Sequence, residues 1–359
     1  MSTNGAHLIP MWREVLELCA VKAGETVTIL TGQRSNPLYI DAATNAALDL
    51  GAKAFRLDLP PMRAAAGGMG SDPNAYLGVT PVTGNRAAVE AMKSADMVVD
   101  LMFLLFSPEQ TEILESGTRI LLAVEPPDIL ARIRPSLDDK RRVKAAEAHL
   151  KRARTMHVTS EGGTDLSVEL GQYPVLTEYG IADEPGRWDH WPSGFLATWP
   201  NEGSASGTVV LDRGDIIFPF KTYVKSPITL TIRDGYIREI KGEFDADYLR
   251  EFMAGFNDPE GYAISHLGWG LQPKAKWTAL EMYDKSQSIG MDGRAFYGNF
   301  LFSTGPNTEG GGKRNTPCHM DIPMRNCSVS LDGEPMTIRG EVIPEDQRAP
   351  GWTKQQAAA

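Results

Sequence analysis

The first part of the chain alternates between two hydrophobic patterns. Segments with apolar residues at helical spacing alternate with short, nearly continuous apolar runs. Such runs are typical of strands buried on both faces of a sheet. Helices are expected over residues 10–21, 39–50, 86–95, 109–116 and 136–153, and strands over 26–30, 54–59, 96–105 and 119–124. This alternation predicts an open, mostly parallel sheet with helices on both faces.

The second part of the chain follows a different pattern, with many strand-like segments and little helix. Strands are expected over residues 158–171, 207–217, 228–232, 237–240, 296–302, 318–322, 327–331 and 335–342, and one helix over 245–256. Asp234-Gly235 lies between two of these strands and predicts a tight hairpin turn. We therefore expect a Rossmann-like α/β domain over residues 1–155 and an α+β domain over residues 156–359, which holds the candidate metal ligands described below.

Composition and charge narrow the classes of partner. The net charge of -10 disfavours nucleic acid, whose phosphates require basic patches. No stretch approaches the roughly 20 apolar residues needed to span a bilayer, and the polar start, residues 1–7, predicts no secretory signal. Three scattered cysteines indicate a reducing compartment. These features predict a cytoplasmic protein without a nucleic-acid or membrane partner.

Glycine-rich segments do not carry the spacing of known phosphate-binding motifs. No Gly-x-Gly-x-x-Gly follows the first expected strand, and Gly310-Gly311-Gly312-Lys313 lacks the Walker spacing. We interpret these segments as ordinary loops, so the parallel sheet is not predicted to bind a nucleotide.

A possible metal site is formed by His319-Met320-Asp321 together with the distant His266. Residues two apart on an extended strand point to the same face, so one ion could take both side chains. Two histidines and one carboxylate leave coordination positions open, an arrangement typical of non-heme Fe(II) oxygenases. The same spacing also occurs in polar pairs that bind no metal.

Residues 171–202 carry few secondary-structure signals but many aromatic and ionisable side chains. Glu178 and His190 are the candidates for acid-base chemistry, which needs a histidine or a carboxylate of raised pKa. Three tryptophans, Trp191 among them, suit a wall against a planar ligand, or anchors that hold the segment to the sheet. Ser303 could hydrogen-bond a substrate, although its Ser-Thr-Gly-Pro context is also common in turns.

Long blocks of this sequence resemble the 2,5-dihydroxypyridine 5,6-dioxygenase family, ring-cleaving enzymes of bacterial nicotinate breakdown. The resemblance runs over nearly the full length, and the family is itself related in fold to the thermophilic metallo-aminopeptidases. The blocks that carry it are GTRILLAVEPPDIL at 117–130, GQYPVLTEYGIADEPGRWDHWPSGFLATWPNE at 171–202, ISHLGWGLQP at 264–273 and AFYGNFLFSTGPNTEGGGKRNTPCHMD at 295–321.

The resemblance implies roles for particular residues. It implies that His266, His319 and Asp321 are ligands of Fe(II), the expected cofactor. It places Glu178 and His190 next to the substrate as catalytic groups. Substrate contacts are expected from Leu105, Phe106, Trp191 and Ser303. At Phe106 the chain departs from the family, which has a histidine there that is thought to contact the substrate.

The implied reaction is cleavage of 2,5-dihydroxypyridine by O2 to N-formylmaleamate, with both oxygen atoms entering the product, by a homo-oligomeric enzyme. One alternative is a metallo-aminopeptidase-like hydrolase, which would need a second metal and further glutamate ligands. Another is a dioxygenase acting on a related hydroxylated N-heterocycle. A third is a non-catalytic protein that binds a ligand at its N-terminal sheet.

Overall fold

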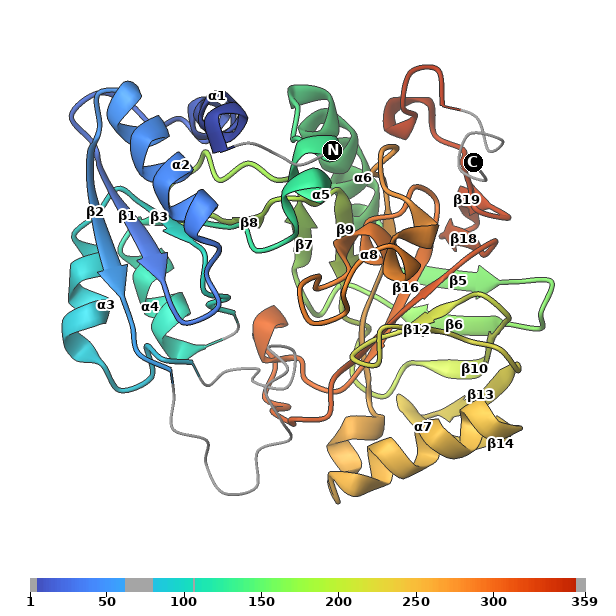
Figure 1. The fold of residues 1–359 in the computed structure, drawn as a ribbon. Helices are drawn as coiled ribbons and strands as arrows, with labels where there is room; N and C mark the ends of the chain where they lie inside the picture. The colour runs from blue at the N-terminus through green and yellow to red at the C-terminus, as the bar shows by residue number, and fades with distance from the viewer. Residues whose placement is uncertain (1–4, 62–79, 106, 353–359) are drawn as a thin grey trace. The chain divides into compact units, whose positions relative to one another are not determined.

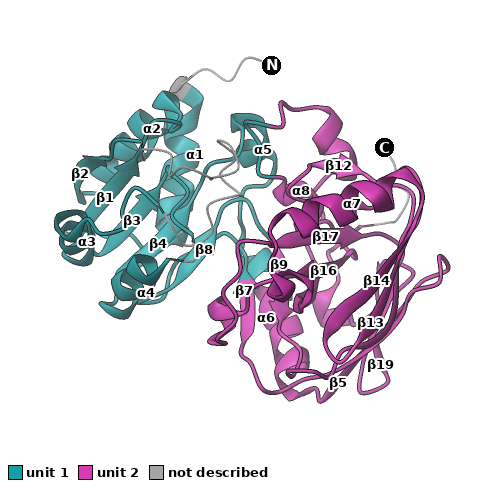
Figure 2. Ribbon diagram, turned by 90° about the horizontal axis from the view of Figure 1, so that it is seen from below, with its two compact units in different colours: residues 1–140, 178–193, 286–289 teal, residues 141–177, 194–285, 290–359 magenta. Residues whose placement is uncertain are grey.

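The computed structural model describes residues 5–61, 80–105 and 107–352, and the chain forms two compact units within it. Unit 1 contains residues 1–140, 178–193 and 286–289, and unit 2 contains residues 141–177, 194–285 and 290–359 (Figure 2). Each unit has its own sheets. The metal-site candidates belong to unit 2.

Unit 1 is built on a five-stranded parallel sheet of order β2-β1-β3-β4-β8. Its strands are β1 (Thr26–Thr31), β2 (Lys53–Asp58), β3 (Met97–Asp100), β4 (Arg119–Leu122) and β8 (Trp188–His190). Its helices are α1 (Gly5–Leu18), α2 (Pro37–Asp49), α3 (Arg86–Lys93), α4 (Pro108–Glu115) and α5 (Pro127–Arg132). Helices α1 and α2 cover one face of this sheet, and α3 and α4 cover the other (Figures 1 and 2). The expected open parallel sheet is confirmed.

Local sequence explains where the helices of unit 1 begin. Asn36, Asn85 and Ser107 each accept a backbone N–H of the first helical turn, which is the role of an N-cap side chain. The apolar faces that follow are buried against the strands; one core cluster joins Val89 of α3, Ile113 of α4 and strand residues of the sheet.

Strand β3 is shorter than the apolar run that predicted it. The run suggested a strand over 96–105, whereas β3 ends at Asp100. The Asp100 carboxylate accepts the backbone N–H groups of the next residues, and Phe103 takes a positive φ of 74°. The side chain therefore turns the chain out of the sheet where hydrophobicity alone predicts that it continues.

Unit 2 contains an eight-stranded sheet of order β14-β13-β10-β6-β5-β18-β19-β20, a five-stranded sheet of order β17-β16-β15-β9-β7 and the pair β11-β12. The strands of the large sheet are β5 (Thr155–Thr159), β6 (Asp165–Glu169), β10 (Ser206–Leu211), β13 (Ile228–Arg233), β14 (Tyr236–Gly242), β18 (Ser328–Leu331), β19 (Glu334–Ile338) and β20 (Glu341–Val342). The remaining strands are β7 (Val175–Glu178), β9 (Phe195–Thr198), β11 (Ile216–Ile217), β12 (Thr222–Tyr223), β15 (Ile264–Gly270), β16 (Phe300–Thr304) and β17 (Met320–Met324). The helices are α6 (Leu137–Arg152), α7 (Phe244–Gly255), α8 (Met291–Arg294), η2 (Pro259–Tyr262), η3 (Trp277–Glu281), η4 (Thr308–Gly310) and η5 (Glu345–Gln347).

Turn chemistry decides which of the expected strands of unit 2 are continuous. The hairpin at Asp234-Gly235 is confirmed, with positive φ at both residues. The run over 158–171 instead forms two strands, β5 and β6, because Ser160 and Thr164 close a tight turn between them. The run over 207–217 is likewise divided into β10 and β11.

The division into units differs from a single cut near residue 155. Residues 171–202, expected to hold little regular structure, contain β7, β8 and β9. Strand β8 pairs in parallel with β4, so residues 178–193 complete the sheet of unit 1 although they follow its first 140 residues by a long interval. Such a pairing between distant segments leaves no local signal in the sequence.

Within the described part of the chain, each helix is too short or too polar to cross a bilayer.

Candidate metal centre

Neighbouring strands of unit 2 deliver the three candidate ligands. His266 lies on β15, Asp321 on β17, and His319 immediately before β17. In the pairing of β15 with β16, the register shifts between Ile264 and Leu267, so that Ser265 and His266 stand opposite a single residue of β16. A bulge of this kind re-aims side chains and is common next to functional sites. The structure therefore brings together the three residues selected from the sequence.

The ligand atoms converge on one point. The Nε2 atoms of His266 and His319 each lie 3.3 Å from Oδ1 of Asp321, and the three side chains are about one-tenth exposed or less. The imidazole rings meet edge to face, with centroids 5.4 Å apart. Oδ1 of Asp321 and Nε2 of His319 are buried without a hydrogen-bond partner among the described residues. Buried acceptors left unpaired are costly, and a cation shared by the three atoms would remove that cost.

The electrostatics of the centre keep its ligands ready to bind a cation. Burial lowers the pKa of His266 to about 4, so its imidazole is neutral and its lone pair available near pH 7. Burial pushes the pKa of Asp321 upward, but the charges of Arg294 and His319 outweigh this and hold it below its usual range. Asp321 is thus a carboxylate. These residues fit a divalent metal ion with two histidine ligands and one carboxylate.

A glycine allows the loop before the ligands to pack closely. Gly305 follows β16 at a φ of +106°, and a Cβ atom there would lie 2.1 Å from the carbonyl oxygen of Cys318. A side chain at this position would push away the residue that precedes His319. Gly305 therefore sets the approach of the ligand segment to β16.

Two further side chains surround the centre. Ser303 stands opposite Asp321 in the β16–β17 pairing, so both side chains lie on the same face of the sheet. The Ser303 hydroxyl is buried without a hydrogen-bond partner among the described residues. The rings of Trp199 and His266 are nearly perpendicular, with centroids 5.9 Å apart. Ser303 can thus offer a hydrogen bond to a molecule at the centre.

Arg294 was missed by the sequence reasoning. Its Nε donates to Oδ2 of Asp321 at 2.7 Å. The residue lies 27 positions before Asp321 in a segment with no recognisable motif, so only its side-chain position identifies it.

Glu178 and His190 lie in unit 1, at the end of β7 and of β8 respectively. Nδ1 of His190 is 3.9 Å from Oε2 of Glu178, and both side chains are buried. Ser193 donates a hydrogen bond to the same carboxylate oxygen at 3.0 Å. His190 ends a strand at the carboxyl edge of a parallel sheet, where such sheets commonly carry functional groups.

Asp189 holds the segments that carry this acid-base pair. It is fully buried and accepts the backbone N–H groups of Tyr179, Gly180 and His190. It also pairs with Arg187, whose guanidinium stacks on the Tyr179 ring. Asp189 therefore fixes the backbone directly after Glu178 and at His190.

The other expected substrate contacts of unit 1 differ in their surroundings. Trp191 is fully buried, its ring packs edge-on against Trp12, and its N–H reaches the carbonyls of Leu130 and Ile133. These contacts match the anchoring alternative for this tryptophan. Leu105 is half-buried after the turn that Asp100 forms, and Phe106 lies outside the described residues.

Replacing Asp100 by asparagine is expected to lower the free energy of unfolding by about 1–3 kcal/mol, because an amide cannot accept all three N–H groups of residues 102–104. Burial raises the pKa of Asp100 to about 6, above that of an unfolded aspartate. The folded wild type therefore binds the proton more tightly, and this group makes it lose stability as pH rises from about 4 to 6. Urea unfolding across that range would measure the slope. An unchanged slope in the variant would contradict this assignment.

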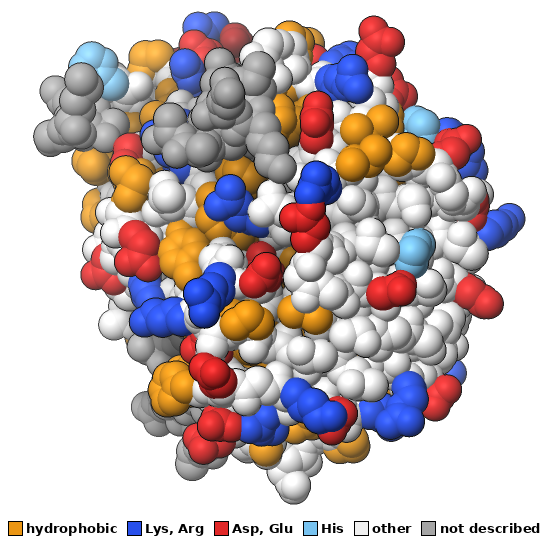
Figure 3. All heavy atoms as spheres, turned by 90° about the vertical axis from the view of Figure 1, so that its right-hand side faces the viewer, with side chains coloured by type: hydrophobic (Ala, Val, Ile, Leu, Met, Phe, Trp, Pro, Cys, Tyr) orange, Lys and Arg blue, Asp and Glu red, His pale blue; other side chains and the backbone are white. Residues whose placement is uncertain are grey.

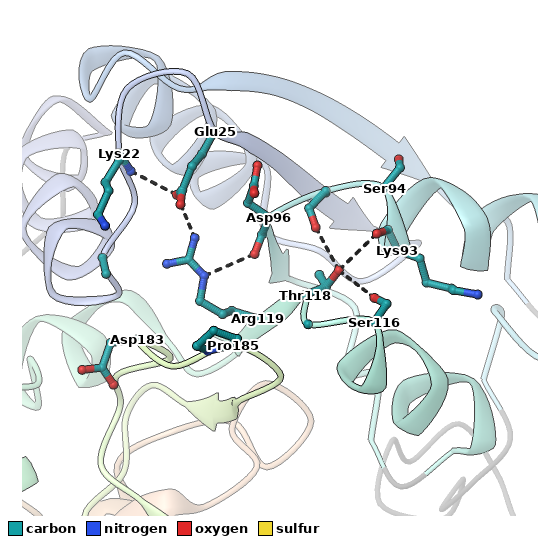
Figure 4. Close-up of a pocket in the computed structure, with 13 residues that line it drawn as sticks. Lys22, Glu25, Lys93, Ser94, Asp96, Ser116, Thr118, Arg119, Asp183 and Pro185 are labelled. Carbon is teal, nitrogen blue, oxygen red and sulfur yellow. Dashed lines mark hydrogen bonds and ion pairs between the residues drawn. The ribbon is translucent and has the colours of Figure 1, made fainter.

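A separate hollow of about 420 Å³ lies in unit 1 at the amino ends of β1, β3 and β4 (Figure 4). Its charged groups already have partners: Arg119 donates to Glu25 at 2.7 Å, and Asp96 accepts the backbone N–H of Thr26 at 2.7 Å. Parallel sheets bind ligands at their carboxyl ends, so this hollow is a weaker candidate than the metal centre.

On the face drawn in Figure 3, outside the grey atoms, basic and acidic side chains are interspersed instead of gathering into a broad basic patch. Binding to nucleic-acid phosphates requires such a patch.

Comparison with known proteins gives full-length matches. The family model described as 2,5-dihydroxypyridine 5,6-dioxygenase matches residues 7–344. A protein of that name from Pseudomonas putida KT2440 is 57% identical over 350 residues, which are 97% of this chain and 100% of that protein. The solved structure of the Pseudomonas putida KT2440 dioxygenase has a TM-score of 0.94 and covers 96% of this chain and 100% of that one.

A more distant likeness concerns the fold alone. Wild-type AmpT from Thermus thermophilus has a TM-score of 0.63 at 15% identity, covering 94% of this chain and 99% of that one. This agrees with the relation in fold expected from the sequence.

Proposed function

The chain belongs to the 2,5-dihydroxypyridine 5,6-dioxygenase family, and from that premise we propose that it cleaves the ring of 2,5-dihydroxypyridine with O2 to give N-formylmaleamate. We propose a single Fe(II) as its cofactor, held by His266, His319 and Asp321. The observation that carries the proposal is the buried meeting of three potential ligand atoms at one point, two of which, Nε2 of His319 and Oδ1 of Asp321, have no hydrogen-bond partner among the described residues.

The choice of iron follows from the donor set. Two imidazoles and one carboxylate, with the other coordination positions open, are typical of non-heme Fe(II) oxygenases. Bound there, the ion would supply open positions and redox chemistry for the ring and O2. His266 contributes by staying neutral, and Asp321 by staying ionised.

The remaining residues would bind the substrate and move its protons. Ser303 would donate its free hydroxyl to a polar group of the ring. Leu105, Phe106 and Trp191 are proposed as substrate contacts from the family resemblance. Glu178 and His190 would remove the substrate's hydroxyl proton and return a proton later. Nδ1 of His190 and Oε2 of Glu178 are 3.9 Å apart, beyond hydrogen-bond distance, so a small shift of either side chain would join them.

The family resemblance also supports a homo-oligomeric state. The three cysteines are free and buried, which supports a reducing compartment such as the cytoplasm.

A hydrolase of the metallo-aminopeptidase kind would need a second metal site beside the first. Among the described residues, the three-ligand cluster at His266, His319 and Asp321 is the one group of histidine, cysteine and acidic side chains with suitable spacing. Metal analysis separates the two functions, since the dioxygenase needs one iron per chain and the hydrolase two ions.

The proposal is tested by anaerobic reconstitution with Fe(II), followed by O2 uptake with 2,5-dihydroxypyridine and mass analysis of the product. We expect uptake of one O2 per ring and entry of both atoms from ¹⁸O2 into the product. Absence of uptake by protein that carries iron would overturn the proposed substrate.

The family has a histidine where this chain has Phe106. O2 uptake with a panel of hydroxylated N-heterocycles, measured for the wild type and for Phe106→His, tests whether this difference changes the substrate. If the wild type prefers another heterocycle and Phe106→His prefers 2,5-dihydroxypyridine, the proposed substrate is wrong and that other heterocycle takes its place.

A further inference from the structure

The two oxygens of Asp321 have different environments. Oδ1 faces the Nε2 atoms of both histidines at 3.3 Å, whereas Oδ2 accepts a hydrogen bond from Nε of Arg294 at 2.7 Å. We propose that Arg294 is a positioning residue that restricts Asp321 to a single coordinating oxygen, Oδ1. This inference rests on the proposed function, because it concerns the same metal centre.

The Arg294 side chain is held in place by stacking. Its guanidinium lies over the Phe218 ring, 3.9 Å from the centroid, and its side chain is 12% exposed. The backbone N–H of Phe218 donates to the carbonyl of Asp321 at 2.8 Å. The ring that supports the arginine is therefore tied to the same residue that the arginine contacts.

The backbone that carries Arg294 is also fixed. Helix α8 begins after Gly290, whose φ is +87°, and a Cβ at Gly290 would lie 2.3 Å from the Phe218 ring. At the other end of the helix, the Asn299 amide donates to the carbonyls of Gly293 and Arg294 at 2.7 and 2.9 Å. These contacts hold α8 against Phe218 and leave the guanidinium little freedom.

This arrangement matters for the number of open coordination positions. A carboxylate can bind a metal through one oxygen or through both. Binding through both would fill a position that the ring or O2 needs. A charged donor on Oδ2 is among the strong hydrogen bonds of proteins, and it also fixes the carboxylate plane. Arg294 thus keeps Oδ2 away from the metal.

The inference is tested with Arg294→Met and Arg294→Lys, using Co(II) alone as the probe of the centre. Arg294→Met removes the hydrogen bond and the charge, and the visible absorption of bound Co(II) should change because its coordination changes. We expect Co(II) affinity to fall by about 10- to 100-fold, the usual effect of losing an outer-shell partner. Arg294→Lys keeps the charge but lacks the planar guanidinium. Its Co(II) affinity and absorption should therefore fall between those of the wild type and Arg294→Met.

Arg325→Met is the matched control. Arg325 also lies over aromatic rings of unit 2, those of Trp277 and Phe296, and its interactions with the described residues do not include His266, His319 or Asp321. Its replacement should leave Co(II) affinity and absorption unchanged. With Fe(II) at saturation, kcat should fall in Arg294→Met and stay constant in Arg325→Met.

Three results separate the possible failures. If wild type binds no Co(II), the metal centre of the proposed function is wrong. If wild type binds Co(II) and folded Arg294→Met gives the same absorption and affinity, the role of Arg294 is wrong. If Arg294→Met does not fold, Arg294→Lys decides, and wild-type absorption and affinity in that variant would overturn the inference.

Discussion

His319→Ala is expected to lower O2 uptake with 2,5-dihydroxypyridine by more than about 100-fold, beyond the usual effect of an outer-shell change, because it removes one of three protein ligands. The variant leaves two donors, His266 and Asp321, which cannot complete the facial set. Iron content after anaerobic reconstitution should fall with activity. The two measurements together distinguish a lost ligand from a lost proton donor, since loss of a proton donor would leave the iron bound.

His157→Ala is the matched control for this experiment. His157 also pairs with an aspartate of unit 2, its Nε2 lying 2.8 Å from Oδ1 of Asp165, but the two side chains are 48% and 76% exposed. A pair that water already solvates can lose one partner at little cost. We expect iron content and O2 uptake to stay at wild-type values. Full activity in His319→Ala would show that the ligand set is wrong.

Asp189→Ala is expected to lower the free energy of unfolding by about 3–5 kcal/mol, the usual range for breaking a buried ion pair from one side. The change removes the Asp189 carboxylate from Arg187, whose side chain is 12% exposed. It also removes the acceptor of three backbone N–H groups, those of residues 179, 180 and 190. Denaturant unfolding followed by far-UV circular dichroism measures the loss.

Asp41→Ala provides the comparison, because Asp41 of helix α2 pairs with Arg56 at 2.7 Å while their side chains are 69% and 48% exposed. Exposed pairs contribute about 0–1 kcal/mol, so this variant should unfold close to the wild type. If the two substitutions lowered the free energy of unfolding equally, Asp189 would not be the residue that holds residues 178–193 in place.

Hydrophobic patterning predicted most elements of both units, because burial on one or two faces leaves a direct record in the sequence. The helix expected over 136–153 is confirmed as α6, and just before its first residue the Ser136 hydroxyl accepts the N–H of Asp139 at 3.2 Å. Where the patterning failed, a polar side chain redirected the chain. Asp100 ends β3 inside an apolar run, and Ser160 closes a turn inside another.

The candidate centre was predictable only in part. The spacing of His319 and Asp321 indicated a shared face. The resemblance was needed to assign the distant His266 to the same ion, and the bulge of β15 explains how its side chain reaches the centre. Arg294 could not be predicted, because its role depends on a side-chain direction set by Phe218 and Asn299. No short-range pattern encodes such a direction.

Strand β8 also bears on the order in which the chain can fold during synthesis. The first four strands of the parallel sheet leave the ribosome well before Trp188–His190. Until β8 is synthesised, one edge of β4 has no neighbouring strand. Unpaired edges invite association with other chains. A nascent chain halted near residue 155 would expose that edge, and the sheet is complete only after Trp188–His190 has been translated.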